Sequence, residues 1–244
     1  MSADFATTQW SKVLAAKDGT DTEARQALDY LCNAYWYPLY AYLRRRGQNP
    51  DQARDLTQAF FTELLEKHRL EAIDQSRGRF RSFLLASLRN FMSHELDKTQ
   101  TLKRGGRVKT VSMDTAGAEI RYKMEPLEAL TPEEIFERRW GLTMMERAME
   151  RLEAEYATKS EPSRFDSLKA YVTGWGSETP YKQAAKQLDM SEGAVKTAVH
   201  RMRTRYGQLL RDEIAQTLAD PKEVDQELRH LLVAIRPWQS EPPR

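Results

Sequence analysis

The feature that most constrains the fold is a helical spacing of apolar residues through almost the whole chain. Apolar side chains recur every three to four positions, the period of an amphipathic helix, in eight segments. These segments cover about residues 23–46, 50–68, 79–98, 132–156, 164–172, 180–189, 191–218 and 223–235. No segment alternates apolar and polar residues for long enough to predict a sheet. The spacing therefore predicts an all-α protein.

Three of these expected helices also carry a start signal. Asn49-Pro50, Thr131-Pro132 and Thr179-Pro180 each place a capping side chain before a proline of the first turn. Such a side chain accepts a hydrogen bond from a free amide of the first turn, and proline has no amide to satisfy there. We expect a helix to begin at each pair.

One stretch separates the expected helices into two groups. Between residues 99 and 131 the helical period is lost, and glycine and proline appear at Gly105-Gly106, Gly117 and Pro126. We interpret this stretch as part of a linker between two helical domains, and we find no internal repeat. The expected divisions are a first domain with an N-terminal extension at 1–98, a linker at 99–140, a second domain at 141–218 and a C-terminal helical extension and tail at 219–244.

Composition narrows the class of protein. Hydrophobic residues make up 40% and charged residues 30% of the chain, which is typical of a folded globular protein. No apolar run approaches the roughly 20 residues that span a bilayer, and the first residues do not resemble a signal peptide. The single Cys32 cannot form an internal disulfide. We expect a cytoplasmic protein with no membrane insertion and no cofactor.

Basic residues are concentrated in one part of the chain. Residues 77–109 contain nine basic and two acidic side chains, a net charge of +7. This stretch places Arg77, Arg79, Arg81, Arg89 and Asn90 beside phenylalanines and leucines. Arginines can follow a phosphate backbone, and an asparagine can hold an unstacked base. The pattern predicts a nucleic-acid contact, either to duplex or to separated strands.

A second candidate contact begins with a short helix over residues 181–188. Ala184 and Ala185 are small enough to let another helix cross closely, Asp189 and Met190 form a turn, and Ser191 can cap the next helix. The next helix carries an apolar stripe of Val195, Ala198, Val199, Met202, Tyr206 and Leu209. This combination predicts a helix-turn-helix.

The opposite face of the second helix carries the candidate DNA contacts. Its N-terminal residues Glu192, Lys196 and Thr197 are placed to meet base edges. His200 is a further candidate DNA contact on this side. The phosphate candidates are Arg201, Arg203 and Arg205. A solvated basic face on a helix of the core is the alternative interpretation.

A third amphipathic pattern lies at residues 51–65. Its expected buried stripe is Ala53, Leu56, Phe60 and Leu64. The polar side carries Asp51, Asp55, Gln58, Thr62 and Glu66. Asp51 and Asp55 lie one turn apart without a third ligand at suitable spacing, so we expect no metal site. Taken alone, this polar face indicates only a solvated helix.

In this order, the three patterns resemble the sigma factors of bacterial RNA polymerase. The resemblance rests on Ala53-x-Asp-Leu-x-Gln-x-x-Phe61, Phe80-Arg-Ser-Phe-Leu with Asn90, Ser191-Glu-Gly-Ala-Val-Lys and His200-Arg201. It covers about residues 25–98 and 142–213 and is strongest to the extracytoplasmic-function branch, which keeps only regions 2 and 4. Arg54 stands where the family usually has an acid, and Asp189 replaces the usual turn glycine.

The resemblance implies a role for each pattern. The helix with Asp51, Asp55, Gln58 and Thr62 would dock on the clamp of core RNA polymerase. The helix from Ser191 would read the −35 element of promoter DNA. The segment that would open and read the −10 element contains Arg77, Arg79, Arg81, Arg89, Asn90 and His94.

The resemblance leaves the mode of regulation open. An anti-sigma protein is one further candidate partner, and a regulatory kinase is another. Phosphorylation of Thr57 would add about −1.5 to −2 charges to the docking helix, in part replacing the acid missing at Arg54.

Two other function classes are compatible with parts of the sequence. A helix-turn-helix regulator could bind duplex promoter DNA without polymerase. An enzyme acting on nucleic acid would need a catalytic centre, but the histidines are scattered and no nucleophile–base spacing appears. We therefore expect a sigma factor and not an enzyme, because only this function gives the docking helix and the basic segment separate roles.

Overall fold

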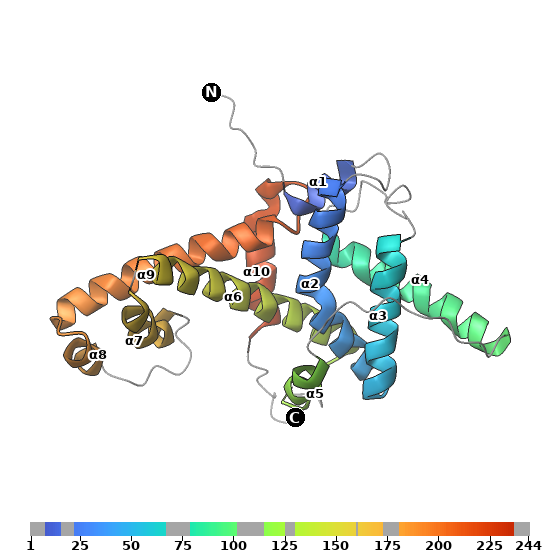
Figure 1. The fold of residues 1–244 in the computed structure, drawn as a ribbon, viewed down its shortest axis with the longest axis horizontal. Helices are drawn as coiled ribbons and strands as arrows, with labels where there is room; N and C mark the ends of the chain where they lie inside the picture. The colour runs from blue at the N-terminus through green and yellow to red at the C-terminus, as the bar shows by residue number, and fades with distance from the viewer. Residues whose placement is uncertain are drawn as a thin grey trace, which may run out of the picture. The chain divides into compact units, whose positions relative to one another are not determined.

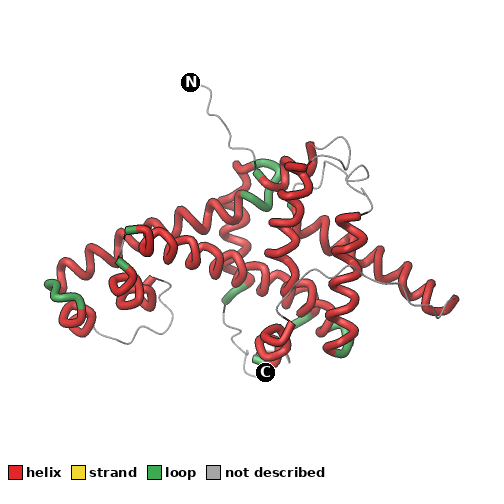
Figure 2. Tube along the Cα trace, viewed as in Figure 1, coloured by secondary structure: helices red, strands yellow, loops and turns green. Residues whose placement is uncertain are grey.

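The computed structural model describes the chain over residues 8–15, 22–66, 79–101, 115–124, 130–159, 161–172 and 181–236. Within these residues it is helical and contains no β-strand, which confirms the all-α prediction (Figures 1 and 2). The helices are α1 Gln9–Ala15, α2 Thr22–Arg45, α3 Pro50–Glu66, α4 Phe80–Thr101, α5 Thr115–Lys123, α6 Pro132–Thr158, α7 Pro162–Val172, α8 Tyr181–Gln187, α9 Glu192–Ala215 and α10 Val224–Ala234, with a 3₁₀ turn η3 at Pro221–Glu223.

Two of the three predicted helix starts lie in this part of the chain, and both are capped. At α3, Asn49 Oδ1 accepts from the Gln52 amide at 2.9 Å, while Gln52 Oε1 accepts from the Asn49 amide at 3.1 Å. At α6, Thr131 and Glu134 exchange the same reciprocal bonds. Each pair satisfies two amides that the first turn leaves free. The Thr179-Pro180 start lies outside the described residues.

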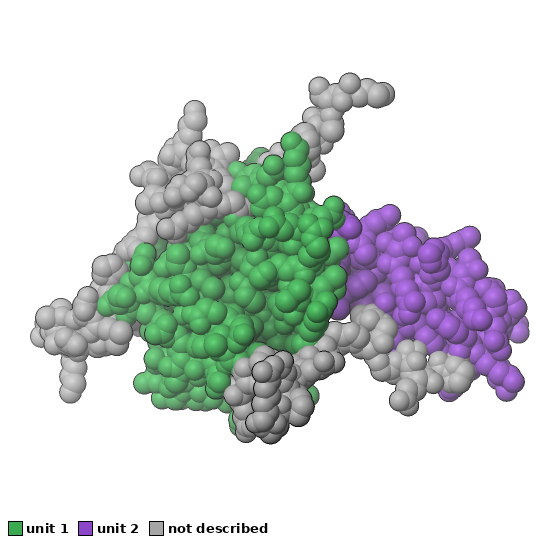
Figure 3. All heavy atoms as spheres, turned by 180° about the vertical axis from the view of Figure 1, so that it is seen from behind, with its two compact units in different colours: residues 1–143, 215–244 green, residues 144–214 purple. Residues whose placement is uncertain are grey.

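The chain divides into two compact units (Figure 3). Unit 1 comprises residues 1–143 and 215–244, and unit 2 comprises residues 144–214. The helix α6 continues from unit 1 into unit 2. This division differs from the expected one, because α5, the start of α6 and the C-terminal extension all group with the first domain.

Unit 1 is built around aromatic side chains from α1, α2 and α4. Trp10 is fully buried, with its ring centroid 4.9 Å from Phe80 and 5.3 Å from Phe83. Tyr35 of α2 meets Phe80 edge-on at 5.0 Å. Such aromatic pairs contribute beyond their buried area, and here they join three helices at the start of α4.

The backbone after α9 ties the N-terminal segment to α4. The Trp10 amide donates to the Gln216 carbonyl at 3.0 Å, and the Phe80 amide donates to the Thr217 carbonyl at 3.0 Å. Thr8 Oγ1 donates to the Leu218 carbonyl at 2.6 Å. Residues 216–218 therefore serve as a hydrogen-bonding strip between two segments far apart in the sequence.

Helix α5 lies within the expected linker and was not predicted. It is short and contains Gly117, so a helical period is hard to detect there. Its position in unit 1 depends on Glu119, which accepts from Arg44 Nε and Nη2 at 3.0 Å each and from the Tyr40 hydroxyl at 2.7 Å. Burial opposes ionisation of Glu119, but these hydrogen bonds outweigh it and lower the pKa of Glu119.

Unit 2 contains the end of α6, the helix α7 and the α8–α9 pair. The predicted stripe on α9 is confirmed, since all six of its residues are buried. A nearly buried carboxylate, Glu213, accepts from Arg147 at 3.0 Å and from Arg151 at 2.8 Å, which fixes α9 to α6.

The predicted helix-turn-helix geometry is present at the α8–α9 junction. Ala184 and Ala185 are buried. Asp189 has a φ of 51°, and the Met190 amide returns to the Ala185 carbonyl at 2.9 Å, which closes α8. Ser191 Oγ accepts from the Ala194 amide at 3.2 Å and so caps α9.

Candidate nucleic-acid interface

The N-terminal half of α9 presents an exposed face opposite its buried stripe. Lys196, Thr197, His200 and Arg201 are all exposed on this face, and Glu192 is exposed in the first turn. The Thr197 hydroxyl donates to the Gly193 carbonyl at 3.0 Å, which leaves its oxygen lone pairs able to accept. These residues form a surface on which base edges and phosphates can both be contacted.

Two of the α9 candidates are engaged within unit 2. Arg203 Nε donates to the Tyr171 carbonyl of α7 at 2.9 Å. Arg205 makes a two-pronged contact with Glu155 of α6, with Nε 2.9 Å and Nη2 2.5 Å from its carboxylate oxygens. The Glu155 hydrogen bonds raise the pKa of Arg205, and the same bonds lower the pKa of Glu155. Both arginines are exposed but engaged, so each links α9 to a neighbouring helix of unit 2, and their predicted DNA contact stays a prediction.

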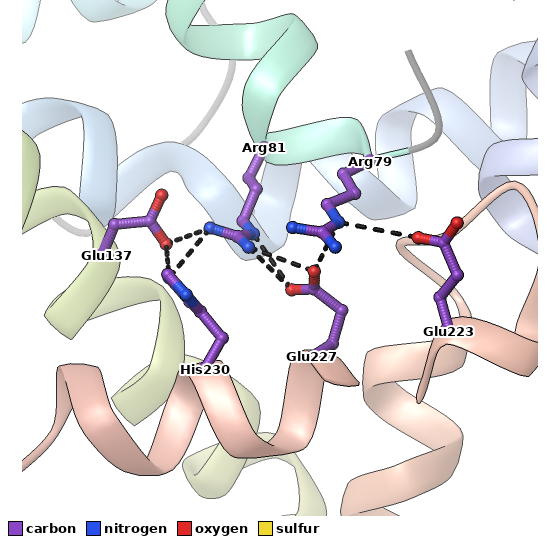
Figure 4. A network of polar contacts seen from close by, with 6 residues as sticks. All are labelled: Arg79, Arg81, Glu137, Glu223, Glu227 and His230. Carbon is purple, nitrogen blue, oxygen red and sulfur yellow. Dashed lines mark hydrogen bonds and ion pairs between the residues drawn. The ribbon is translucent and has the colours of Figure 1, made fainter. Parts of the chain in front are cut away.

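The start of α4 differs most from expectation. Arg81 was predicted to contact DNA, but only 5% of it is exposed. Its guanidinium donates from Nε and Nη2 to both oxygens of Glu227 on α10 at 3.1 Å, and Nη1 contacts Glu137 on α6 (Figure 4). It also lies 4.8 Å from the ring centroid of Trp140. In this conformation Arg81 joins three helices and does not face solvent.

Arg79 belongs to the same cluster. Its Nε lies 2.6 Å from Glu227 Oε1 and 3.6 Å from Glu223 Oε2, and 29% of its side chain is exposed (Figure 4). Burial opposes the charge of Arg81, but Glu137 and Glu227 outweigh that effect and raise the pKa of Arg81. The His230 ring nitrogen completes the cluster at 3.0 Å from Glu137 Oε2. We call these residues the α4 ion cluster: Arg79, Arg81, Glu137, Glu223, Glu227 and His230.

The sequence pattern gave no sign of this cluster. Its carboxylates lie 56 to 148 positions along the chain from the arginines, and helical spacing reports only neighbours on one helix. The signal that could have revealed Glu227 is its position on the apolar side of α10, beside Leu228 and Leu231, where a carboxylate requires a buried cation.

Further along α4, the candidate contacts remain accessible. Arg89 and Asn90 are both exposed. Arg89 Nη2 donates to Glu133 Oε1 at 2.7 Å, and the two side chains are 51% and 45% exposed. A pair this exposed contributes only about 0–1 kcal/mol, so a phosphate can compete for Arg89. Arg77 lies outside the described residues, as does the side chain of His94.

The polar side of α3 is exposed to solvent, and its negative charge is partly neutralised by a basic residue. Asp51 and Asp55 are exposed, while Gln58 and Thr62 are half-buried. Arg54 lies between the two acids, 3.0 Å from Asp51 Oδ1 and 3.3 Å from Asp55 Oδ1. The basic residue at this position thus pairs with both acids of the predicted docking face.

The buried stripe of α3 is shifted from the expected one. Ala53, Phe60 and Leu64 are buried as predicted, but Leu56 is only half-buried. Thr57 and Phe61 are fully buried in its place. The Thr57 hydroxyl donates to the Ala53 carbonyl at 2.7 Å, so a kinase could reach it only if α3 moved.

Two further classes of site are absent from the described part of the chain. No three histidine, cysteine, aspartate or glutamate side chains there come together in a way that could hold a metal. None of the helices described is long and apolar enough to cross a membrane.

These features define an all-α protein whose second unit carries a helix-turn-helix. Residues 31–101, from within α2 to the end of α4, match the family model of sigma-70 region 2. This part of the chain is thus similar to sigma-70 region 2, and the similarity supports a sigma factor role in transcription initiation. No curated protein and no solved structure matches the chain significantly.

Proposed function

We propose that the chain is a sigma factor of the extracytoplasmic-function branch, which binds core RNA polymerase and directs initiation from promoters with −10 and −35 elements. One observation carries the proposal: a sigma-70 region 2 in unit 1 is joined in the same chain to a helix-turn-helix in unit 2. A regulator that acts without polymerase needs the second part but has no use for the first.

The polar side of α3 is the proposed polymerase-docking surface, with Asp51, Asp55, Gln58 and Thr62 as contacts. It is supported by the exposure of both aspartates. Arg54 competes for them, but its pairs are exposed, with 40% of its own side chain accessible. Because such pairs are weak, docking onto a basic partner can displace them.

Promoter contacts divide between the two units. On α4, Arg89 is the proposed phosphate contact and Asn90 the proposed base contact of the −10 element. On α9, Lys196, Thr197, His200 and Arg201 are the proposed −35 contacts, supported by their common exposed face. Arg203 and Arg205 act by fixing α9 to α7 and α6.

Association with core polymerase tests the docking surface. In the full chain, Asp55→Lys should weaken binding to core polymerase at least tenfold, which corresponds to about 1.4 kcal/mol. Asp166→Lys makes the same charge change on α7, where Asp166 is exposed and pairs with Lys169, and serves as the control. Co-elution and fluorescence titration measure both.

The other function classes are outcomes of the same experiment. Equal affinities of the two variants would contradict the docking surface. Tight duplex binding by a chain that never associates with polymerase would establish the polymerase-independent regulator. Turnover of a nucleic-acid substrate would establish an enzyme. An anti-sigma protein and a kinase remain predicted partners.

A further inference from the structure

The arginines at the start of α4 are satisfied by carboxylates from outside the matched region 2. Arg79 and Arg81 lie within residues 31–101. Glu137 comes from α6, while Glu223 and Glu227 come from the C-terminal segment (Figure 4). The matched domain therefore supplies two cations, and added parts of the chain supply their partners.

The arrangement around Glu227 matches the way a phosphate is held. Glu227 is completely buried, and its two oxygens bridge Arg79 Nε at 2.6 Å and Arg81 Nη2 at 2.9 Å. Guanidinium groups pair with carboxylate and phosphate in the same two-pronged geometry. The same two arginines could therefore pair with a backbone phosphate in place of Glu227.

We propose that α10 is a displaceable carboxylate clamp, in which Glu223 and Glu227 occupy Arg79 and Arg81 in place of nucleic-acid phosphates. Release of α10 increases the affinity of unit 1 for single-stranded DNA. The proposal rests on the proposed function, since it assumes that region 2 contacts promoter DNA.

The contacts that hold α10 lie at identifiable positions. Leu231 and Ile235 are its buried apolar anchors, and they lie against Gly141 of α6. Arg138 Nη1 caps the end of α10 by donating to the Ile235 carbonyl at 3.0 Å. The outward-facing Leu232 and Val233 are 50% and 62% exposed. Helices this short are unstable in isolation, so α10 depends on this docking.

The energetics of the ion cluster also favour a reversible contact. Burial of several charges removes their hydration, and this penalty offsets most of their mutual attraction. Solvent exposure falls from the edge of the cluster to its centre. The Glu223 side chain is 43% exposed, whereas the Arg81 side chain is 6% exposed. A polyanion can therefore compete first at Arg79, before the buried pair opens.

Gly141 provides a test that leaves every charge in place. A Cβ at this position would lie 2.8 Å from Ile235 Cγ2 and 3.2 Å from Leu231 Cγ. Gly141→Ala should therefore push α10 from α6. Leu231→Asp, which places a charge in the same buried contact, ensures release if the alanine is accommodated. Hydrogen exchange of the α10 amides reports release, and circular dichroism reports that the rest of the chain stays folded.

The measurement is the affinity of the full chain for a labelled single-stranded oligonucleotide of random sequence, at several salt concentrations. With α10 released, we expect binding several-fold tighter than wild type. Its log–log salt slope should steepen by roughly 0.7 for each arginine freed. Glu223→Gln should give a smaller gain of the same sign. The charge-matched control is Glu23→Gln on α2, where 78% of the Glu23 side chain is exposed.

Three results would overturn the proposed carboxylate clamp. Release of α10 with unchanged or weaker binding would overturn it, and so would a gain no larger than that of Glu23→Gln. Unfolding of unit 1 together with α10 would also overturn it, because the helix would then be a permanent part of the core. Polymerase binding by the wild type is measured separately. Its absence would refute the proposed function while leaving a gain in DNA binding attributable to the clamp.

Discussion

Left-handed backbone at two residues closes the helices that precede the candidate contacts. Gly47, with a φ of 91°, ends α2, and Asp189, with a φ of 51°, ends α8. Glycine adopts this conformation without strain, whereas a side chain with a Cβ meets the neighbouring carbonyl. Aspartate tolerates it better than most residues, which explains how α8 can turn into α9 without a glycine.

Substitution of Asp189 tests whether its left-handed backbone affects the stability of unit 2. Asp189→Val should lower the free energy of unfolding of unit 2 by about 1 kcal/mol, because a β-branched side chain fits the left-handed region poorly. Asp189→Gly should leave it unchanged or raise it by about 0.5 kcal/mol. Hydrogen exchange of the α8 and α9 amides measures both. A cost for Asp189→Val no larger than that of Lys182→Val, on the exposed side of α8, would contradict the prediction.

Glu119 gives a pH dependence whose sign follows from its contacts. The hydrogen bonds from Arg44 and Tyr40 lower its pKa in the folded chain despite partial burial. Its contribution to stability is therefore complete above the unfolded pKa of about 4.3, and it is lost as pH falls through the lower folded value.

The variant Glu119→Gln isolates this contribution. At pH 7 it should unfold at a lower urea concentration than wild type, and the difference should shrink as the solution is acidified below pH 4.3 or so. Urea titrations of both proteins across this range provide the measurement. A difference that stays constant with pH would show that the Glu119 charge does not hold α5.

The limits of sequence reasoning are clearest at Arg81 and Leu56. Arg81 was placed among the DNA contacts because it is basic and sits in a basic segment, yet its environment is set by Glu227, 146 positions away. Leu56 was placed in the core because it is apolar, but Thr57 is the buried residue. Thr57 can be buried because its hydroxyl finds a carbonyl within its own helix.

Helices α3, α6 and α9 were predictable because each is long, periodic and capped. All begin within one residue of the expected position. Helices α1 and α5 were not predicted, since each is shorter than three turns and depends on contacts distant in sequence. Trp10 fixes α1 through aromatic packing, and Glu119 fixes α5 through Arg44.

Arg201 and Arg205 lie one turn apart on α9, but the pairing of Arg205 with Glu155 predicts different effects for their removal. Arg201→Ala should weaken binding to duplex DNA and make its log–log salt slope shallower by about 0.9, because one phosphate contact is lost. Arg205→Ala should change the salt slope less, because Arg205 is held by a two-pronged pair with Glu155, a geometry that resists displacement better than a single exposed contact. Titrations at several salt concentrations separate the two. Equal slopes for both variants would show that the pair with Glu155 does not keep Arg205 from a phosphate.

At the scale of the whole molecule, the C-terminal segment groups with unit 1, which also holds residues 31–101, the part that matches region 2. The hydrogen-bonding strip at 216–218 and the helix α10 both belong to unit 1, although α9 between α8 and this segment belongs almost entirely to unit 2. The order of the elements along the chain would place this C-terminal segment next to the second domain. Helical spacing could predict that α10 forms, but not the surface that its Glu227 meets.

Promoter-directed initiation tests the central claim most directly. The purified full chain is added to core RNA polymerase with a linear fragment library of the source genome, and the 5′ ends of the transcripts are mapped. We expect discrete start sites that share −10 and −35 elements, are absent with core polymerase alone, and are reduced by Asp55→Lys more than by Asp166→Lys. Start sites no different from those of core polymerase alone would contradict the assignment as a sigma factor.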